Sequence, residues 1–419
     1  MKEYKSMVSM ENIYHAYLNL KGVVVRTPLL KNLNLSEKFD ANVLLKREDL
    51  QVVRSYKIRG AYNKIFSLSD AEKAKGIVCA SAGNHAQGVA YSCRLLGIYG
   101  RIYMPTTTPK QKITQVKMFG REFIEIIIQG DTFDDAFQKA LEESISTEKA
   151  FIPPFDDVKI IEGQATTALE IIEDLTEEPD YIFIPIGGGG LASGISTVIK
   201  NKFKNTKIIG VEPEGAPSMK TSIDAGENIT LQKIDTFVDG AAVKRVGDIT
   251  FEICRNLLDD IVLVPEGKVC TTILKLYNEE AIVVEPAGAL TIAALDFYKE
   301  EIKGKNVVCL VSGSNNDITR TEEIRERSMF YEGLKHYFII RFAQRAGALR
   351  EFLMDVLGPN DDITYFEYSK KNNREKGPAI IGVEIPHKDD FEGLIDRMRD
   401  KRIVFEYLND NFDLFQHII

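Results

Sequence analysis

Residues 181–191 read Tyr-Ile-Phe-Ile-Pro-Ile-Gly-Gly-Gly-Gly-Leu, an apolar run that leads into consecutive glycines. The apolar run predicts a strand buried on both faces, and we expect a helix to begin at Leu191. A flexible turn is the simplest interpretation of the glycines. Without Cβ atoms, however, backbone N–H groups can close around phosphate oxygens, and the N-terminus of the following helix favours the anion. The stretch therefore predicts an α/β sheet with a phosphate site at its edge.

The same order of strand and helix recurs along the chain on both sides of this stretch. Strands are expected near 43–46, 76–80, 101–105, 122–128, 207–211, 261–264 and 306–311. Helices are expected near 55–67, 84–96, 109–120, 132–148, 267–279 and 287–298. This alternation predicts parallel sheets covered by helices on both faces.

Small polar residues or glycines follow three of these strands. Ser81, Gly187 and Ser312 each stand just past the expected carboxyl end of a strand. Ligands of such sheets bind beyond the carboxyl ends of the strands. We therefore expect the three stretches to converge on one edge.

The pattern changes after about residue 333. Strands are expected over 337–342, 363–368, 379–385 and 404–408, with helices over 347–357 and 391–400. The resulting β-α-β-β-α-β order is ferredoxin-like. A helix around 322–327 would connect this unit to the rest. The basic residues Lys370, Lys371 and Arg374 are interpreted as a solvated hairpin loop rather than a binding patch.

Composition narrows the class of protein. A chain of 419 residues with 44% apolar residues is expected to form two or more domains with full cores. The net charge of −9 and the lack of a dense Lys/Arg stripe argue against a nucleic-acid partner. Five cysteines without C-x-x-C pairing suggest buried thiols rather than disulfides. The polar N-terminus and the absence of an apolar run near ~20 residues predict a cytoplasmic protein without a membrane partner.

A lysine motif connects these features to chemistry. Residues 55–61 read Ser-Tyr-Lys-Ile-Arg-Gly-Ala, and residues 81–85 read Ser-Ala-Gly-Asn-His. Taken alone, Lys57 would be a surface charge on a helix. Together with a small polar turn and a glycine run, a lysine amine that can form an imine fits an aldehyde cofactor that carries a phosphate.

With these motifs the chain resembles pyridoxal-phosphate enzymes of the tryptophan-synthase-β type (fold type II). Within that group it is similar to short biosynthetic threonine dehydratases with one ACT-like domain. The motif Ser-aromatic-Lys-x-Arg-Gly-Ala carries the match, with Tyr56 where the family commonly has Phe. The resemblance implies a catalytic domain over 1–333 with two parallel-sheet subdomains, the smaller about 50–150, and an ACT-like regulatory domain over 334–419.

The resemblance also implies roles for individual residues. Lys57 would bind the cofactor as a Schiff base and then remove the substrate Cα proton. The implied cofactor-binding residues are Tyr56, Lys57, Asn84, Gly187, Gly188, Gly189, Gly190, Leu191 and Ser312. The implied substrate-binding residues are Ser81, Ala82, Gly83, Asn84 and His85.

Simpler interpretations stand beside several of these roles. Asn84 could cap the following helix, and Ser312 could be an ordinary turn residue. His85 is assigned to loop geometry rather than to catalysis. Relatives such as serine racemase hold a divalent cation in the stretch matching 212–218; here Ser218 stands where their Asp would be, so no metal is expected.

The implied reaction is the dehydration and deamination of L-threonine to 2-oxobutanoate and ammonia, the first committed step of isoleucine biosynthesis. Isoleucine is the implied inhibitor, valine a candidate opposing effector, and a homotetramer the implied assembly. L-serine dehydration or serine racemization on the same fold is the alternative, which the C-terminal unit disfavours. A cysteine-forming β-replacement enzyme and a non-catalytic amino-acid sensor are further rivals, and the intact motifs argue against the sensor.

Overall fold

A computed structural model describes residues 8–343, 345–368 and 376–409. The chain divides into two compact units, Met1–Asp317 and Ile318–Ile419. We call them the first and the second unit. Within the described residues no helix has the length and apolar character needed to cross a membrane.

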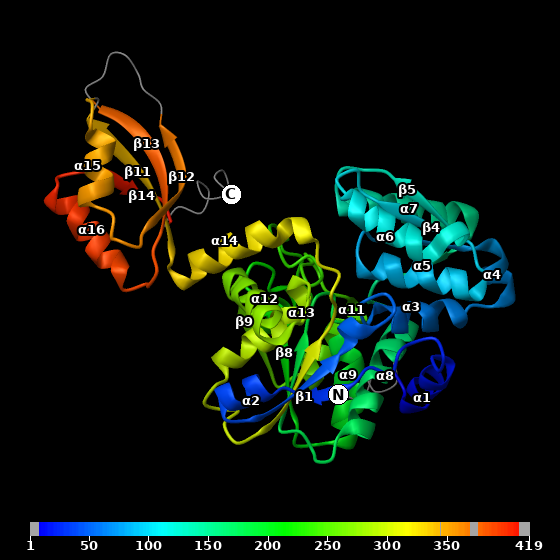
Figure 1. The fold of residues 1–419 in the computed structure, drawn as a ribbon. Coiled ribbons are helices and arrows are strands. Elements are labelled where there is room, and N and C mark those ends of the chain that lie inside the picture. The colour runs from blue at the N-terminus through cyan, green and yellow to red at the C-terminus, as the bar shows by residue number, and fades with distance from the viewer. Residues whose placement is uncertain (1–7, 344, 369–375, 410–419) are drawn as a thin grey trace. The chain divides into compact units, whose positions relative to one another are not determined.

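The first unit contains a larger and a smaller sheet (Figure 1). The larger sheet has the strand order β1-β2-β10-β7-β8-β9. β1 pairs antiparallel to β2, and the remaining pairs are parallel, including β2 with β10. Its strands are β1 (Leu29–Lys31), β2 (Asn42–Arg47), β7 (Tyr181–Pro185), β8 (Lys207–Pro213), β9 (Asp260–Val264) and β10 (Asn306–Val311).

Helices cover both faces of the larger sheet because its strands are apolar on both sides. Along β10, Val308 and Leu310 enter a core shared with α8, α9 and α11. Cys309 points the other way, since side chains alternate along a strand. Its sulfur lies 3.9 Å from the carbonyl of Thr291 in α13. These helices are α8 (Val158–Asp174), α9 (Gly190–Lys202), α11 (Asp248–Leu257) and α13 (Pro286–Ala293).

The smaller sheet is parallel, with the order β5-β4-β3-β6. Ile77 and Cys79 of β3 face a core formed with α3, α5 and α6. Val78 and Ala80 face the opposite side, where α7 packs. The elements are α3 (Lys57–Phe66), β3 (Ile77–Ala80), α5 (Asn84–Leu96), β4 (Gly100–Met104), α6 (Lys110–Gly120), β5 (Ile124–Ile128), α7 (Phe133–Thr147) and β6 (Ala150–Phe151).

Helix α8 packs between α3 and α9 at near-backbone distance. A Cβ atom added to Gly163 of α8 would lie 2.6 Å from the Cα of Gly60 in α3. A Cβ atom on Gly194 of α9 would lie 2.8 Å from the backbone nitrogen of Ala165 in α8. Real Cβ atoms do not approach other atoms this closely, so α8 sets the spacing between the helix that begins with Lys57 and the helix that follows the glycines.

The second unit has the antiparallel sheet order β12-β13-β11-β14. Phe338 of β11 shares one core with Phe352 of α15 and Leu394 of α16. The predicted ferredoxin-like order is therefore confirmed, and Lys370, Lys371 and Arg374 lie outside the described residues. The elements are α14 (Thr321–Glu332), β11 (Lys335–Ala343), α15 (Ala348–Asp355), β12 (Asp362–Tyr368), β13 (Lys376–Glu384), α16 (Asp390–Asp400) and β14 (Val404–Tyr407).

Helix α14 is held to this sheet by charge. The Lys335 ammonium lies 2.8 Å from the Glu384 carboxylate and 3.4 Å from that of Glu326 in α14. The Tyr337 hydroxyl also donates to Glu326. The remaining helical elements of the described chain are α1 (Met10–Asn19), α2 (Leu33–Phe39), η2 (Glu48–Leu50), α4 (Asp70–Lys75), η3 (Arg121–Phe123), α10 (Ser218–Ala225), α12 (Glu266–Glu280), η4 (Ala294–Phe297) and η5 (Ile318–Arg320).

The expectation of a single sheet edge is wrong. Ser81 follows β3 of the smaller sheet, whereas Gly187 and Ser312 follow the adjacent strands β7 and β10 of the larger sheet. The loops beyond these strands are joined instead by side chains, as described next.

Candidate active site

Lys57 is the first residue of α3, and the turn before it is fixed to the end of β10. Ser55 forms an antiparallel bridge with Gly313. The backbone N–H of Tyr56 donates to the carbonyl of Ser312 at 3.2 Å. Two of the predicted cofactor-binding residues, Tyr56 and Ser312, are thereby placed beside Lys57.

The Lys57 amine points toward the segment that precedes α8. Its Nζ donates to the carbonyl oxygen of Pro154 at 2.9 Å and lies 5.5 Å from the centre of the Tyr56 ring. Although the residue as a whole is partly exposed, the dense surroundings of the amine lower its pKa to about 8, against an opposing effect of Glu285. At neutral pH a larger share of this amine is therefore neutral than for an ordinary lysine, as a nucleophile or base requires.

The glycines connect β7 to α9 in a shape that side chains would disturb. Gly189 has φ +93°, a conformation that L side chains rarely adopt. A Cβ on Gly188 would lie 2.2 Å from the ring of Phe155. The Thr250 hydroxyl donates to the Gly188 carbonyl at 2.6 Å. Leu191 is buried in the core of the larger sheet, which anchors the start of α9.

Pro154 and Phe155 connect the two halves of the site. One supplies the carbonyl that receives the Lys57 amine, and the ring of the other packs on Gly188. In space, these two consecutive residues therefore lie between Lys57 and the glycine loop. Neither residue was predicted from the sequence to lie in the site.

The stretch from Ser81 to His85 leads from β3 into α5. Within it the Ser81 hydroxyl accepts from the N–H of Gly83 at 3.2 Å, and Ala82 packs on the core of the smaller sheet. Gly83 occupies the N-cap position, and Asn84 makes no capping hydrogen bond. The capping interpretation of Asn84 is therefore not what the structure shows.

Asn84 instead joins the two sheets. Its amide nitrogen donates to Glu285 at 2.6 Å, and its carbonyl oxygen accepts from the amide of Asn315 at 2.7 Å. Glu285 directly precedes α13, and Asn315 lies beyond β10. These bonds bring the loop after β3 to the edge where Ser312 lies.

His85 is buried and neutral. Its Nε2 lies 2.9 Å from the carbonyl oxygen of Ile152, just before Pro154. Burial, together with the charge of Lys57, lowers the pKa of His85 to about 3. The neutral ring therefore contacts the backbone of the segment that leads to Pro154.

Glu285 was not assigned a role from the sequence. Burial and the charge of Asp239 raise the pKa of its carboxyl to about 7. One signal was present, because Glu285 is a lone acid in the apolar stretch 281–289. An acid in an apolar run is expected to be buried, and a buried carboxylate needs a hydrogen-bond donor or an opposite charge.

Glu212 and Ser218, in the stretch that matches the cation site of serine racemase, make hydrogen bonds to the backbone. The Glu212 carboxylate accepts the N–H groups of Met219 at 2.7 Å and Lys220 at 2.9 Å, in the first turn of α10. The Ser218 hydroxyl donates to the carbonyl of Val243. Among the residues that the structure describes, no group of three or more His, Cys, Asp or Glu side chains is arranged to hold a metal ion.

Comparison with known proteins accounts for both units. Residues 20–313 match the family described as pyridoxal-phosphate dependent enzyme, and residues 326–418 match the C-terminal regulatory domain of threonine dehydratase. A biosynthetic L-threonine dehydratase (IlvA) of Halalkalibacterium halodurans is 60% identical over 412 residues, covering 98% of this chain and 99% of the relative.

Solved structures agree with this assignment. Threonine deaminase isoform 2 of Solanum lycopersicum has a TM-score of 0.72 and 40% identity, covering 76% of this chain and 89% of its own. Maize serine racemase has a TM-score of 0.71 and 30% identity, covering 78% of this chain and 99% of its own. The chain belongs to the pyridoxal-phosphate dependent enzyme family and, within it, to the biosynthetic threonine dehydratases.

Proposed function

We propose that this chain dehydrates and deaminates L-threonine to 2-oxobutanoate and ammonia. The observation that carries the proposal is the Lys57 amine, whose pKa is lowered to about 8 and which is separated from the glycine loop by Pro154 and Phe155. The full-length similarity to an enzyme named as a biosynthetic threonine dehydratase supports the choice of substrate.

The residues of the first unit fit pyridoxal phosphate. A Cβ atom on Gly188 or Gly189 would clash with Phe155 or Thr250, so the turn needs glycine at both positions. The turn leads into the N-terminus of α9, where a phosphate is favoured. The buried hydroxyl of Ser55, beside Lys57, has no hydrogen-bond partner within the described residues. We assign the cofactor to Tyr56, Lys57, Asn84, Gly187, Gly188, Gly189, Gly190, Leu191 and Ser312.

The substrate side is assigned to the loop that begins α5. The first turn of a helix carries N–H groups without intrahelical partners and a positive end of the dipole, which favours a carboxylate. We place the substrate carboxylate at Ser81, Ala82, Gly83, Asn84 and His85.

The chain and its cofactor divide the work. When bound, pyridoxal phosphate supplies an electron sink for the electron pair left at Cα. Lys57 would hold the cofactor, and its neutral amine would take the proton from the substrate Cα. Ser312 offers an uncharged hydroxyl, which does not enforce protonation of a ring nitrogen as a carboxylate would.

The second unit contains the proposed regulatory domain. We propose isoleucine as inhibitor and valine as its opponent, with the effector near the turn between β11 and α15. There Arg345 forms a bidentate ion pair with Glu351, at 2.8 and 2.6 Å, and Gly347 has φ +87°. We further propose a catalytic domain over 1–333, a regulatory domain over 334–419, a homotetramer and a cytoplasmic location. Cys79, Cys93, Cys254 and Cys309 are free and buried, as expected in a reducing compartment.

Serine is the competing substrate, because serine racemase shares the fold at 30% identity. A substrate panel decides between them: turnover of L-threonine should exceed that of L-serine, and isoleucine should inhibit it. An absorbance band near ~410 nm, lost on borohydride treatment, would report the imine-bound cofactor. Racemization of serine without dehydration of threonine would contradict the proposal.

A further inference from the structure

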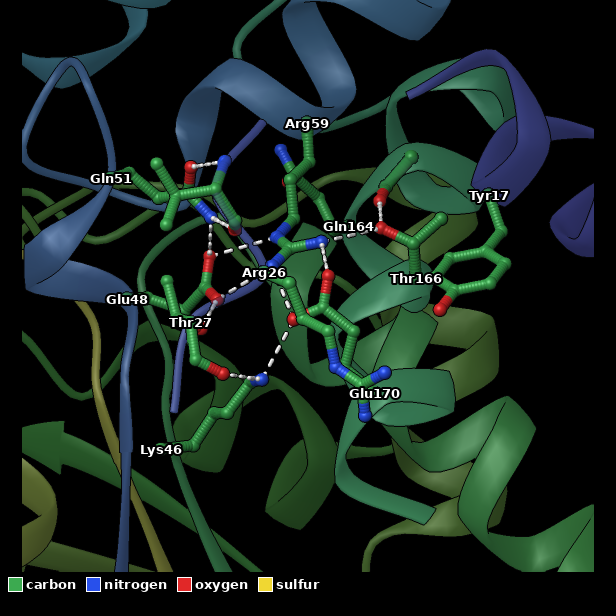
Figure 2. Close-up of polar contacts among 12 residues, drawn as sticks. Tyr17, Arg26, Thr27, Lys46, Glu48, Gln51, Arg59, Gln164, Thr166 and Glu170 are labelled. Carbon is green, nitrogen blue, oxygen red and sulfur yellow. Dashed lines mark hydrogen bonds and ion pairs between the residues drawn. The ribbon is translucent and has the colours of Figure 1, made fainter. Parts of the chain in front are cut away.

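A cluster of four charged side chains is buried against α3, the helix that begins with Lys57. Figure 2 shows its polar contacts. The cluster consists of Lys46, Glu48, Arg59 and Glu170, each at most 2% exposed. The two positive and two negative charges balance. Neither the cofactor nor the substrate assignment uses any of them.

Arg59 is the centre of this cluster, and every N–H of its guanidinium has an acceptor. Two N–H groups donate to the Glu48 carboxylate at 2.8 Å each. Two more donate to the Glu170 carboxylate at 2.7 and 2.8 Å. The fifth donates to the hydroxyl of Thr166 at 3.1 Å. Figure 2 shows Arg59 held between the two carboxylates.

The outer bonds of the cluster tie it to the larger sheet. The Lys46 ammonium, on β2, donates to Glu170 at 2.7 Å and to the carbonyl of Thr27 at 2.6 Å. The Thr27 hydroxyl donates to Glu48 at 2.5 Å. Burial works to lower the pKa of Arg59, but the charges of Glu48 and Glu170 hold it above its ordinary value. Arg59 therefore stays charged between the two carboxylates.

The stability of the fold does not by itself explain why these charges are buried. Burying ions costs several kcal/mol each, and well-packed apolar residues often stabilise a fold as much or more. What the apolar alternative lacks is direction, because a bidentate arginine–carboxylate pair fixes both angle and distance. The cluster fixes α3 relative to β2 and α8.

Arg59 lies in the same helical turn of α3 as Lys57. Residues two apart on a helix point about 200° from each other, so Arg59 grips the side of α3 that faces away from the lysine. The apolar residues Ile58, Ala61 and Ile65 of α3 belong to the core of the smaller sheet. Arg59 thus connects α3, which packs on the smaller sheet, through Glu170 to Lys46 in β2 of the larger sheet. The glycine loop follows β7 of that same larger sheet.

We propose that Arg59 is a positioning residue for Lys57. Through Glu48 and Glu170 it holds the first turn of α3 at the angle that keeps the Lys57 amine at the Pro154 carbonyl, next to the Phe155 ring that packs on the glycine loop. This inference rests on the proposed function for the identity of the reaction, and on the geometry alone for the position of the amine.

The test replaces Arg59 by lysine, which keeps the charge but cannot form two bidentate pairs. Arg101→Lys is the matched control, because Arg101 pairs with Glu143 and Glu125 in the smaller sheet, away from α3. In the cofactor-free proteins, the pH dependence of Lys57 acetylation by acetic anhydride is followed by peptide mass spectrometry. In the holoenzymes, kcat and KM for L-threonine and the melting temperature are measured.

Arg59→Lys should raise the midpoint pH of Lys57 acetylation by about one unit, because water reaches the amine. It should lower kcat on the order of 10- to 100-fold with a smaller change in KM, since misplacing a reacting group affects the chemical step. Arg101→Lys should change neither. If Arg59→Lys lowers only the melting temperature, and its acetylation midpoint and kcat equal those of Arg101→Lys, the proposal is overturned. The cluster would then stabilise the fold without positioning Lys57.

A milder pair of variants covers the case in which Arg59→Lys does not fold. Thr166→Val removes one acceptor of Arg59, whereas Thr167→Val removes a buried hydroxyl that has no partner among the described residues. The Thr166 variant should shift the acetylation midpoint upward and the Thr167 variant should not; equal midpoints would overturn the proposal. If the wild type does not dehydrate threonine, the proposed function fails, but the acetylation midpoints still decide the positioning role.

Discussion

The amide of Asn84 donates to the carboxylate of Glu285 over 2.6 Å, which links the loop after β3 of the smaller sheet to the residue before α13 on the larger sheet. Each residue lies at the N-terminal end of a helix, α5 and α13 respectively. The protonation state of Glu285 therefore affects its hydrogen bond with Asn84, which we assign to both the cofactor and the substrate.

This relationship gives a pH prediction for the cofactor-free protein. The pKa of Glu285 is raised to about 7, so between pH 4.5 and 7 the folded state binds a proton that the unfolded state releases. The free energy of unfolding should therefore fall as pH rises through that window, by about 3 kcal/mol for this group. Glu285→Gln should remove this fall, because glutamine does not titrate.

Denaturant unfolding of both proteins at pH 5 and pH 8 measures the effect. Glu212 and Glu266 also have raised pKa values, but they contribute equally to both proteins and drop out of the difference. A wild-type minus variant difference that is the same at the two pH values would show that Glu285 titrates normally.

Lys57→Ala should abolish threonine dehydration and leave the fold intact. The variant lacks both the proposed point of cofactor attachment and the proposed base, while α3 keeps its apolar contacts through Ile58 and Ala61. The borohydride-sensitive absorbance should disappear, and the circular dichroism spectrum should match that of the wild type. Dehydration above trace levels would end the assignment of Lys57.

Gly188→Val should prevent cofactor binding. Its Cβ would lie 2.2 Å from the Phe155 ring, so either the ring or the loop must move. Gly393→Val in α16 is the control, since the nearest atom to its Cβ is the flexible end of Arg397 at 3.2 Å. Equilibrium dialysis with pyridoxal phosphate should show full occupancy in the control and little in the variant. Equal occupancy would place the phosphate elsewhere.

Ending the chain after Asp317 should separate catalysis from regulation. The cut leaves the cores of both sheets complete, whereas a cut near residue 335 would remove Lys335 and Tyr337 from α14. The shortened chain should dehydrate threonine without responding to isoleucine. Inhibition by isoleucine that survives the cut would locate the effector site in the first unit.

The sequence predicted the strands and the motif-bearing helices well, because both depend on local signals. The apolar run 181–185 became β7, and the helix expected over 84–96 is α5 with the same bounds. Lys57, Asn84 and Ser312 were singled out through the resemblance to a family, and the glycine loop through its position between a strand and a helix.

Helix α8 was not predicted, and its physical character explains why. Residues 160–171 are all buried, so no polar face marks the helical period. Gly163, Thr166 and Thr167 also form helices poorly in isolation. Their value lies in long-range contacts: Gly163 meets Gly60, and Thr166 receives Arg59. Glu285 and Asn315 escaped assignment for the same reason, because their partner Asn84 is distant in the chain.

The pairing of β2 with β10 governs how this protein can be made. Asn42 and Asn306 are hydrogen-bonded across a separation of 264 residues, so β2 leaves the ribosome long before its neighbour exists. The smaller sheet, which is built from residues of 77–151, can close first. Until β10 emerges, β2 has an unpaired apolar edge, and such edges slow folding and promote aggregation. Chaperone demand during synthesis should therefore concentrate on nascent chains that end between β2 and β10.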